Sequence, residues 1–277
     1  EALPLLQRAA AAAPQVAEFQ LHLGETLAML GRPREALDYF IAVLRIDPRH
    51  VPARSGAAAA LLVLGHTSQA VEQFAAAAQL QPNNAALMGN WGFALMRNGQ
   101  LNDAIALLRN AVQIDPNLHG AWLQLAEAVW RSGQYEKAVA PARRAVELDP
   151  KDLRSMVLLG NTLQTAGEML ESAEVYRRAV ALDPTSSDAH VNLALVLLKS
   201  GRARESLDMY DAIVARWPGL HDARANRALA LLTLGDFERG LVEYEARWHS
   251  PALAPKLHPG QKWDGTDPAG KTILLAS

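Results

Sequence analysis

Cysteine is absent from the 277-residue chain. Its absence excludes disulfide bonds, thiol nucleophiles and cysteine-based metal centres, and it is compatible with the cytoplasm, the location that we expect. No stretch approaches the roughly 18 to 20 uninterrupted apolar residues of a membrane span, so no membrane partner is expected. Basic residues are not in excess, because the formal net charge is −2. Nucleic acid, which proteins bind by neutralising its phosphates, is therefore not expected as a partner either.

Proline and glycine are regularly spaced along the chain. Two sets of residues recur every 34 positions, namely Pro14, Pro48, Pro82, Pro116, Pro150, Pro184 and Pro218, and Gly31, Gly65, Gly99, Gly133, Gly167, Gly201 and Gly235. Because proline cannot continue a helix and glycine readily supplies the residue that ends one, each period predicts two helices, which we call helix A and helix B. The predicted fold is all-α, a solenoid in which each repeat packs on its neighbours.

Side-chain size also repeats with this period. Counted from Ala17, position 8 of helix A and position 20 of helix B hold only Gly, Ala or Ser, and position 11 holds only Leu or Val. Small residues on facing helices allow close approach of the backbones, and branched aliphatic residues fill the seam. Position 24 is usually bulky, as in Phe40, Phe74, Leu108, Tyr176, Tyr210 and Tyr244.

These columns resemble the tetratricopeptide repeat, whose helix A carries a Leu-Gly or Leu-Ala pair and whose helix B carries Ala, an aromatic residue, Ala and Pro. The resemblance implies a right-handed αα superhelix with a short irregular C-terminal extension. Residues 1–16 are expected to be helix B of a truncated preceding repeat, and residues 251–277 a Pro/Gly-rich linker that begins a missing C-terminal domain. The seven expected repeats are 17–50, 51–84, 85–118, 119–152, 153–186, 187–220 and 221–250.

The two ends of the array carry further predictions. The exposed face of residues 1–14 is expected to promote self-association. The last repeat departs most from the pattern, because Arg227 replaces the apolar residue of position 7 and Arg247 stands at position 27. The packing of this last repeat is the least determined by the pattern.

The sequence of residues 235–275 contains motifs that the preceding repeats lack. These residues contain Tyr-Glu-x-Arg-Trp at 244–248, Trp-Asp-Gly at 263–265 and an apolar run at 273–275. This segment resembles a junction in bacterial proteins where a tetratricopeptide array leads into a glycosyltransferase-like domain, related to O-linked N-acetylglucosamine transferases and flagellin-modifying enzymes. The resemblance implies that the chain is the substrate- or partner-recruiting arm of such a protein. The alternative is a free-standing adaptor for protein assembly.

Residues 265–272 satisfy the spacing of a phosphate-binding P-loop. A working P-loop follows a hydrophobic strand and opens a helix, whereas polar residues precede this segment and a strand-like run follows it. Pro268 also removes one N–H from the phosphate cradle. We therefore expect a turn here, and a nucleotide-binding enzyme is the least favoured alternative.

Other catalytic patterns are missing from the sequence. Its eight histidines show no HExxH motif or comparable metal spacing, and His50, His119 and His221 fall beside the turns between repeats. The carboxylates Glu171 and Glu174 are expected on the surface of a helix B. No catalytic residue, cofactor or metal ligand is predicted, so the chain itself is not expected to be an enzyme.

Helix A lines the concave face of tetratricopeptide arrays, with positions 2, 5, 6, 9, 12 and 13 pointing inward. Position 6 holds His22, Asn90, Gln124, Asn192 and Asn226, and position 9 holds Glu25, Glu127 and Asn161. An amide can both donate to and accept from an extended peptide backbone. The column predicts a partial ladder, interrupted by Gly56 and Leu158, that resembles the asparagine ladder of O-linked N-acetylglucosamine transferases. The alternative is a row of solvated amides.

Cations and apolar groups share this face. Position 13 supplies Arg97, Arg131 and Lys199, and position 2 supplies Arg154. The apolar inward residues Phe93, Met96, Trp130, Leu195 and Leu229 would suit the hydrophobic strip of an amphipathic partner helix, with Trp130 as the best anchor. The predicted protein- or peptide-binding residues are Glu25, Asn90, Phe93, Arg97, Gln124, Glu127, Trp130, Arg131, Asn161, Asn192, Lys199 and Asn226.

The carboxylate clamp of chaperone adaptors in this family provides a sharper comparison. It needs a basic residue at position 5, asparagines at positions 9 and 6, and basic residues at positions 2 and 6, taken from successive repeats. The matching places hold Val157, Asn161, Asn192, Asp222 and Asn226. Because the three cations are missing, chaperone tails are not expected as partners.

Overall fold

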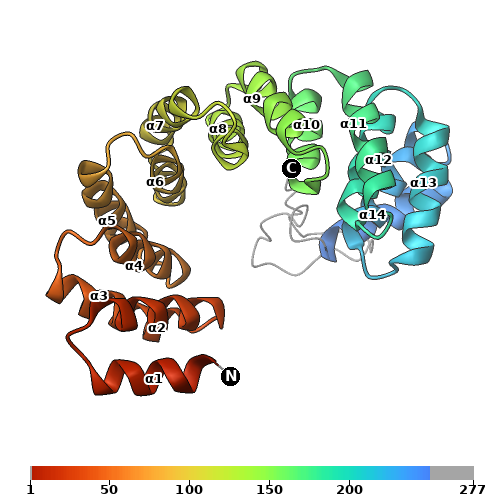
Figure 1. Cartoon of the computed structure of the whole chain (residues 1–277). Helices are drawn as coiled ribbons and strands as arrows, with labels where there is room; N and C mark the ends of the chain where they lie inside the picture. The colour runs from red at the N-terminus through yellow and green to blue at the C-terminus, as the bar shows by residue number, and fades with distance from the viewer. Residues whose placement is uncertain (1, 250–277) are drawn as a thin grey trace, which may run out of the picture. The chain divides into compact units, whose positions relative to one another are not determined.

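The structure, a computed structural model, describes residues 2–249, and in that range it consists of helices joined by short turns, with no strand (Figure 1). The helices are α1 (Ala2–Ala12), α2 (Ala17–Met29), α3 (Pro33–Ile46), α4 (Val51–Val63), α5 (Thr67–Leu80), α6 (Ala85–Arg97), α7 (Leu101–Ile114), α8 (His119–Arg131), α9 (Tyr135–Leu148), α10 (Leu153–Thr165), α11 (Met169–Leu182), α12 (Ser187–Lys199), α13 (Ala203–Arg216), α14 (His221–Thr233) and α15 (Phe237–Tyr244). A 3₁₀ helix, Glu245–His249, follows. The predicted all-α solenoid of helix pairs is confirmed, with helices A at α2, α4, α6, α8, α10, α12 and α14.

A glycine ends every helix A. The seven periodic glycines from Gly31 to Gly235 have φ between 73° and 88°, a left-handed conformation that only glycine adopts without strain. At the first of these turns, the Gly31 N–H donates to the Ala28 carbonyl at 3.0 Å. The next N–H, that of Arg32, donates to the Leu27 carbonyl at 2.9 Å. This Schellman motif satisfies the last carbonyls of helix A and turns the chain into helix B.

An aspartate shapes several of the turns that end helix B. The carboxylate of Asp47, which directly precedes Pro48, accepts the N–H of Arg49 at 2.9 Å. Asp115, Asp149 and Asp183 make the same bond to the residue two places on, at 2.8–3.0 Å. Such a bond holds a tight turn while the following proline prevents the helix from continuing.

The chain divides into two compact units, Glu1–Ala166 and Gly167–Ser277, which we describe separately. In the first unit, consecutive helices A contact one another directly from α2 to α10, whereas consecutive helices B make no comparable contact in its described part. Helices A therefore line the inner side of this unit, and helices B splay apart on its outer side (Figure 1). In the second unit, α12 and α14 likewise contact each other.

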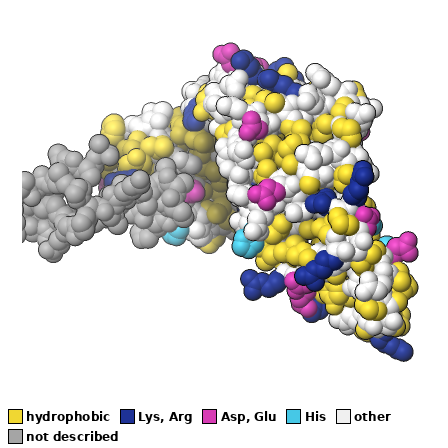
Figure 2. All heavy atoms as spheres, turned by 90° about the vertical axis from the view of Figure 1, so that its left-hand side faces the viewer, with side chains coloured by type: hydrophobic (Ala, Val, Ile, Leu, Met, Phe, Trp, Pro, Cys, Tyr) yellow, Lys and Arg dark blue, Asp and Glu magenta, His cyan; other side chains and the backbone are white. Residues whose placement is uncertain are grey.

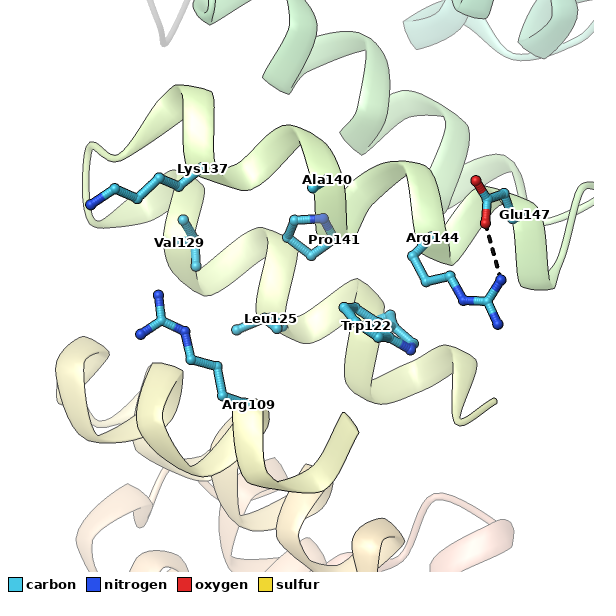
Figure 3. A pocket seen from close by; sticks show the side chains of 9 residues that line it. All are labelled: Arg109, Trp122, Leu125, Val129, Lys137, Ala140, Pro141, Arg144 and Glu147. Carbon is cyan, nitrogen blue, oxygen red and sulfur yellow. Dashed lines mark hydrogen bonds and ion pairs between the residues drawn. The ribbon is translucent and has the colours of Figure 1, made fainter. Parts of the chain in front are cut away.

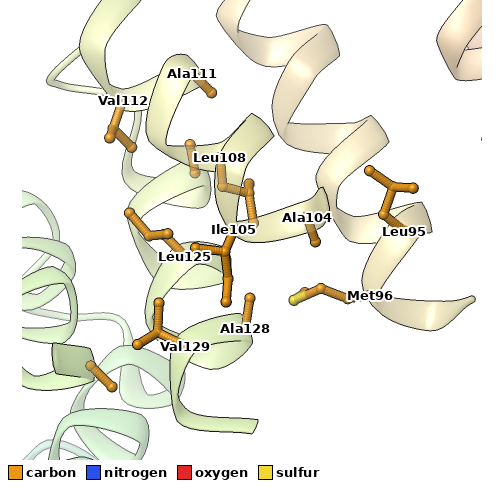
Figure 4. Close-up of a cluster of buried hydrophobic side chains, with 12 residues drawn as sticks. Leu95, Met96, Ala104, Ile105, Leu108, Ala111, Val112, Leu125, Ala128 and Val129 are labelled. Carbon is orange, nitrogen blue, oxygen red and sulfur yellow. The ribbon is translucent and has the colours of Figure 1, made fainter. Parts of the chain in front are cut away.

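Each helix B packs between two helices A, as the core around α7 shows. Ile105 and Leu108 of α7 lie between α6 and α8, where they meet Leu95, Leu125 and the small residues between them (Figure 4). Gly92 on α6 permits this packing, because a Cβ atom there would lie 2.6 Å from Cγ of the fully buried Leu108. The small residues of position 8 thus set the distance between the paired helices.

The structure corrects one predicted contact residue and leaves others undescribed. Met96, predicted to face a partner, is 1% exposed and belongs to the core around α7, so no partner can reach it. The P-loop pattern at 265–272 and the linker from residue 250 onward lie outside the described residues. Among residues 2–249, no helix is long and apolar enough to cross a membrane.

Candidate peptide-binding face on helices A

The predicted amide column contains two accessible side chains without an internal partner. Asn90 on α6 is exposed and Asn192 on α12 is half-buried, and neither side chain makes a hydrogen bond within the described part of the chain. Their amides can still donate and accept. Each can therefore bind a peptide backbone without breaking an existing contact.

The other amides of the set are already engaged or covered. Asn226 on α14 lies near the hydroxyl of the fully buried Tyr210, which donates to the Val191 carbonyl at 3.4 Å; burial raises the pKa of that tyrosine, and Asn226 acts to lower it. Asn161 on α10 also has an internal interaction. The Oε1 atom of Gln124 on α8 is buried and has no donor among the described residues. The amides of this column therefore differ in their availability to a partner.

Gly56 interrupts the column for a steric reason that the sequence does not reveal. A Cβ atom at Gly56 would lie 2.6 Å from two ring atoms of Phe40, and one at Gly24 would lie 2.9 Å from the same ring. The Phe40 ring, 2% exposed, is therefore held between α2 and α4, where both neighbours must be glycine. No amide fits at this point of the column.

The cations predicted for this face are partly neutralised. Glu127 on α8 binds Nη2 of Arg154 at 2.8 Å and lies 3.8 Å from Nη1 of Arg131. By contrast, Arg97 and Lys199 are exposed and have no ion pair in the described part. Figure 2 views the molecule from the left-hand side of Figure 1, on the outer side of the first unit and not on the helix A face, and there side chains of both signs are interspersed among hydrophobic atoms. The strongest free positive groups of the predicted site are thus at the ends of α6 and α12.

Glu25 on α2 and Trp130 on α8 are also held by neighbours. Glu25 is exposed and lies 3.1 Å from Nδ1 of His22. The indole N–H of the half-buried Trp130 donates to Oγ1 of Thr165 at 3.0 Å, which ties α8 to α10. Phe93 on α6 is half-buried against the core around α7. These aromatic rings are accessible but fixed.

Position 13 contains two residues that the sequence interpretation missed. Met29 is 82% exposed and Val63 is 74% exposed, and they end α2 and α4 at the place where Arg97 and Arg131 end α6 and α8. All seven residues of this column are exposed. The signal was present in the sequence, because Met29 and Val63 stand in the same inward column as Arg97, Arg131 and Lys199.

His119, Ser155 and Asp152 meet at the turn between α9 and α10 and have the composition of a catalytic triad. Ser155 is fully buried, and its hydroxyl donates to Asp152. The His119 Nε2 atom, 2.9 Å from the same hydroxyl oxygen, must then donate to it and cannot act as its base. The Asp152 carboxylate also accepts the Ser155 N–H at 3.0 Å, so the cluster caps α10.

The Asp152 cap predicts a pH-dependent stability. Burial acts to raise the pKa of Asp152, but the hydroxyl and N–H of Ser155 and the His119 ring together hold this pKa below its ordinary value. Because the depressed pKa stabilises the fold only while the carboxyl is ionised, we expect Asp152→Ala to cost about 1–2 kcal/mol at neutral pH. The cost should shrink as the pH falls from about 5 to about 2, because the wild-type carboxyl then becomes protonated.

Urea unfolding of both proteins across this pH range measures the effect, and Ser186→Ala is the matched control. Ser186 caps α12 through a neutral hydroxyl, which accepts the Ala189 N–H at 3.3 Å. Its loss should cost a similar amount at every pH. A penalty for Asp152→Ala that did not change with pH would show that the charge plays no part.

Groups of acidic, histidine and cysteine side chains that could hold a metal ion are not found in residues 2–249.

Profiles of the tetratricopeptide repeat match residues 1–51, 27–89, 95–157, 153–186 and 191–256, which together span most of the chain. No curated protein matches the sequence.

Solved structures of several repeat proteins are similar to this chain. YrrB, described as a TPR protein with an unusual peptide-binding site, has 20% identity and a TM-score of 0.53, with 66% of this chain and 95% of YrrB covered. PilW, a type IV pilus biogenesis factor, has 20% identity and a TM-score of 0.68, with 74% and 95% covered. MamA from Desulfovibrio magneticus RS-1 has 24% identity and a TM-score of 0.56, with 61% and 96% covered. At these identities the likeness shows the fold, and with the profiles it establishes that the chain belongs to the tetratricopeptide repeat family.

Proposed function

We propose that this chain is a protein-binding scaffold that holds an extended segment of a partner protein along its helices A. One observation carries the proposal. Helix α6 has an amide, an apolar group and a cation at positions 6, 9 and 13, which are Asn90, Phe93 and Arg97. Helix α12 repeats the same three chemical groups at the same positions with Asn192, Leu195 and Lys199.

The spacing of these groups favours recognition of an extended chain. Residues separated by three and seven positions lie along one stripe of a helix. The amide can bond the partner's backbone, the apolar group can cover one side chain and the cation can pair with a carboxylate. Because Asn90 and Arg97 are exposed and unpartnered, neither must give up an internal bond to do so.

Two variants, chosen because their amides are free, test the proposal. Short peptides would first be selected from a random displayed library on the wild-type protein. Asn90→Ala and Asn192→Ala are each expected to weaken binding of the selected peptides about 3- to 10-fold, as the loss of one or two hydrogen bonds predicts. Asn226 is left out, because it lies near the buried Tyr210 hydroxyl and its replacement would also change the surroundings of that group.

The matched control is Asn110→Ala on α7. Asn110 is exposed on a helix B and its side chain makes no hydrogen bond within the described part of the chain, so its replacement removes an equivalent amide from the opposite side. Circular dichroism should show unchanged helicity in all three variants. If library selection yields no peptide, or if the control weakens binding as much as Asn90→Ala, the helix A face is not the binding site.

The finer proposal is that this scaffold recruits partners or substrates for a bacterial glycosyltransferase-like protein, and it rests on the sequence resemblance of residues 235–275. The described part of that segment supports a structural role for its motif. The Arg247 guanidinium lies over the Tyr244 ring at 4.3 Å, and its Nη1 atom donates to the Tyr244 carbonyl at 3.0 Å. These two motif residues thus close the end of α15 together.

Reading the coding sequence that follows the Ser277 codon tests this finer proposal. A continuation into a Rossmann-like domain of roughly 200–300 residues would support the recruiting arm. A stop codon or further 34-residue repeats would leave the free-standing adaptor. We also propose that the protein is located in the cytoplasm. Self-association through α1 is a further part of the proposal, and it is favoured by the 65% exposure of Leu5 on that helix.

A further inference from the structure

A pocket of about 380 Å³ opens on the helix B side of the first unit, between α7 and α9 (Figure 3). Its floor is helix α8, which presents Trp122, Leu125 and Val129. The last two side chains are 4% and 2% exposed, so the floor is continuous with the hydrophobic core. The volume lies within the roughly 300–1,000 Å³ that is usual for ligand pockets. None of the residues of the proposed helix A face lines it.

Small residues in α9 make the hollow. Helices B splay apart in this unit, and Ala140 and Pro141 are the apolar residues with which α9 lines the gap. In α9 the positions 22 to 24 are Ala140, Pro141 and Ala142. Pro141 lies inside the helix and has no N–H for the Lys137 carbonyl, an arrangement that costs about 3 kcal/mol in a helix interior. The wall that α9 forms is therefore apolar and built of small residues, and it lacks the helical hydrogen bond that residue 141 would otherwise donate to the Lys137 carbonyl.

Cations surround this apolar floor. The Arg109 guanidinium of α7 points into the gap between the helices and has no partner in the described part of the chain (Figure 3). Lys137 donates to Oε1 of Gln134 at 3.1 Å, a neutral partner. Arg144 pairs with Glu147 at 3.0 Å. Three cations and one carboxylate leave the rim with a formal charge of +2, although the whole chain carries −2.

We propose that this pocket binds an acidic segment of a partner protein, which inserts one aliphatic or aromatic side chain over the floor. The inserted side chain covers Leu125 and Val129, and neighbouring carboxylates of the segment pair with Arg109 and Lys137. The apolar floor favours a peptide over a nucleic acid, because phosphates would use the cations alone. The site is a second interaction surface, on the side opposite to helices A.

Fluorescence anisotropy with a short labelled peptide tests this site. The peptide has one central phenylalanine between two runs of glutamate. We expect saturable binding with a Kd below about 1 mM, which is the range of a single anchored side chain with two ion pairs. Replacing the phenylalanine with serine, or the glutamates with lysines, should each weaken binding at least about tenfold.

Two variants change the pocket and two leave it intact. Arg109→Glu reverses the free cation, and Ala140→Leu fills the hollow from an exposed helix position; each should reduce affinity about tenfold or more. Arg178→Glu makes the same charge change at an exposed residue of α11 and should change affinity less than about twofold. Asn90→Ala should also have no effect, which separates this site from the helix A face.

Several outcomes would overturn the proposal. They are no saturable binding to the wild-type protein, equal binding of the serine peptide, and equal losses in Arg109→Glu and Arg178→Glu. Binding of a short single-stranded oligonucleotide with the same dependence on Arg109 would identify a phosphate site instead. Circular dichroism of each variant shows whether a loss comes from unfolding.

Discussion

Replacing Gly56 with asparagine, which would complete the amide column, is expected to destabilise the first unit by about 2–3 kcal/mol. Two atoms of the Phe40 ring lie 2.6 Å from the place of the new Cβ, and the ring also packs closely against Gly24, where a Cβ would lie only 2.9 Å from it. The ring is 2% exposed. The clash must therefore be relieved by separating α2 from α4, and a decrease in the midpoint of urea unfolding measures it.

Ala59→Asn provides the comparison for this variant. Ala59 is exposed on the same helix α4, so its replacement introduces the same side chain without a clash. Its cost should be the difference in helix propensity, about 0.5–0.7 kcal/mol. Equal losses in the two variants would mean that the Phe40 ring moves aside freely.

Replacing Arg227 with methionine is expected to cost about 2 kcal/mol in the second unit, although it restores the apolar residue that the repeat pattern favours. The Arg227 guanidinium binds both Glu243 oxygens, at 2.7 and 2.6 Å, and lies 3.1 Å from Asp211. The side chains of Arg227 and Glu243 are only 17% and 23% exposed. Methionine would leave Glu243 half-buried without a cation, and partial exposure keeps the cost below that of a fully buried pair.

The double variant Arg227→Met with Glu243→Leu tests this explanation. Because replacing both partners of an ion pair with apolar residues is often neutral, we expect most of the lost stability to return. Hydrogen exchange of the α15 amides reports the local effect, since the pair links α14 to α15. Arg239→Met, which removes an exposed contact 3.5 Å from Asp236, should cost less than about 0.5 kcal/mol. No recovery in the double variant would show that Arg227 acts by packing alone.

The ion pair also explains how the last repeat departs from the pattern without losing its fold. Position 7 is apolar from α2 to α12 and is arginine in α14. The charge is accepted because α13 and α15 each supply a carboxylate at the same place, Asp211 and Glu243. This arrangement fixes α15, where the segment that resembles a glycosyltransferase junction begins.

The sequence alone determined the secondary structure and the stacking of this protein. Its helix ends follow from the periodic glycines and prolines, because φ preference and the loss of an N–H act on the residue itself and need no distant partner. The exposure of position 13 and the burial of position 24 follow from helical periodicity. The Asp-Pro turns, which we did not predict, also have a local signal, the aspartate before Pro48, Pro116, Pro150 and Pro184.

Only the tertiary structure decided which of the aligned side chains are free. Met96 is covered by the core, Asn226 lies near the buried hydroxyl of Tyr210, and Glu127 is paired with Arg154 from the next repeat. The pocket beside Pro141 likewise depends on three separate helices. The physical reason is that a column of the repeat fixes the direction of a side chain, whereas its contacts depend on the size and charge of residues 15 or more positions away, which differ from one repeat to the next.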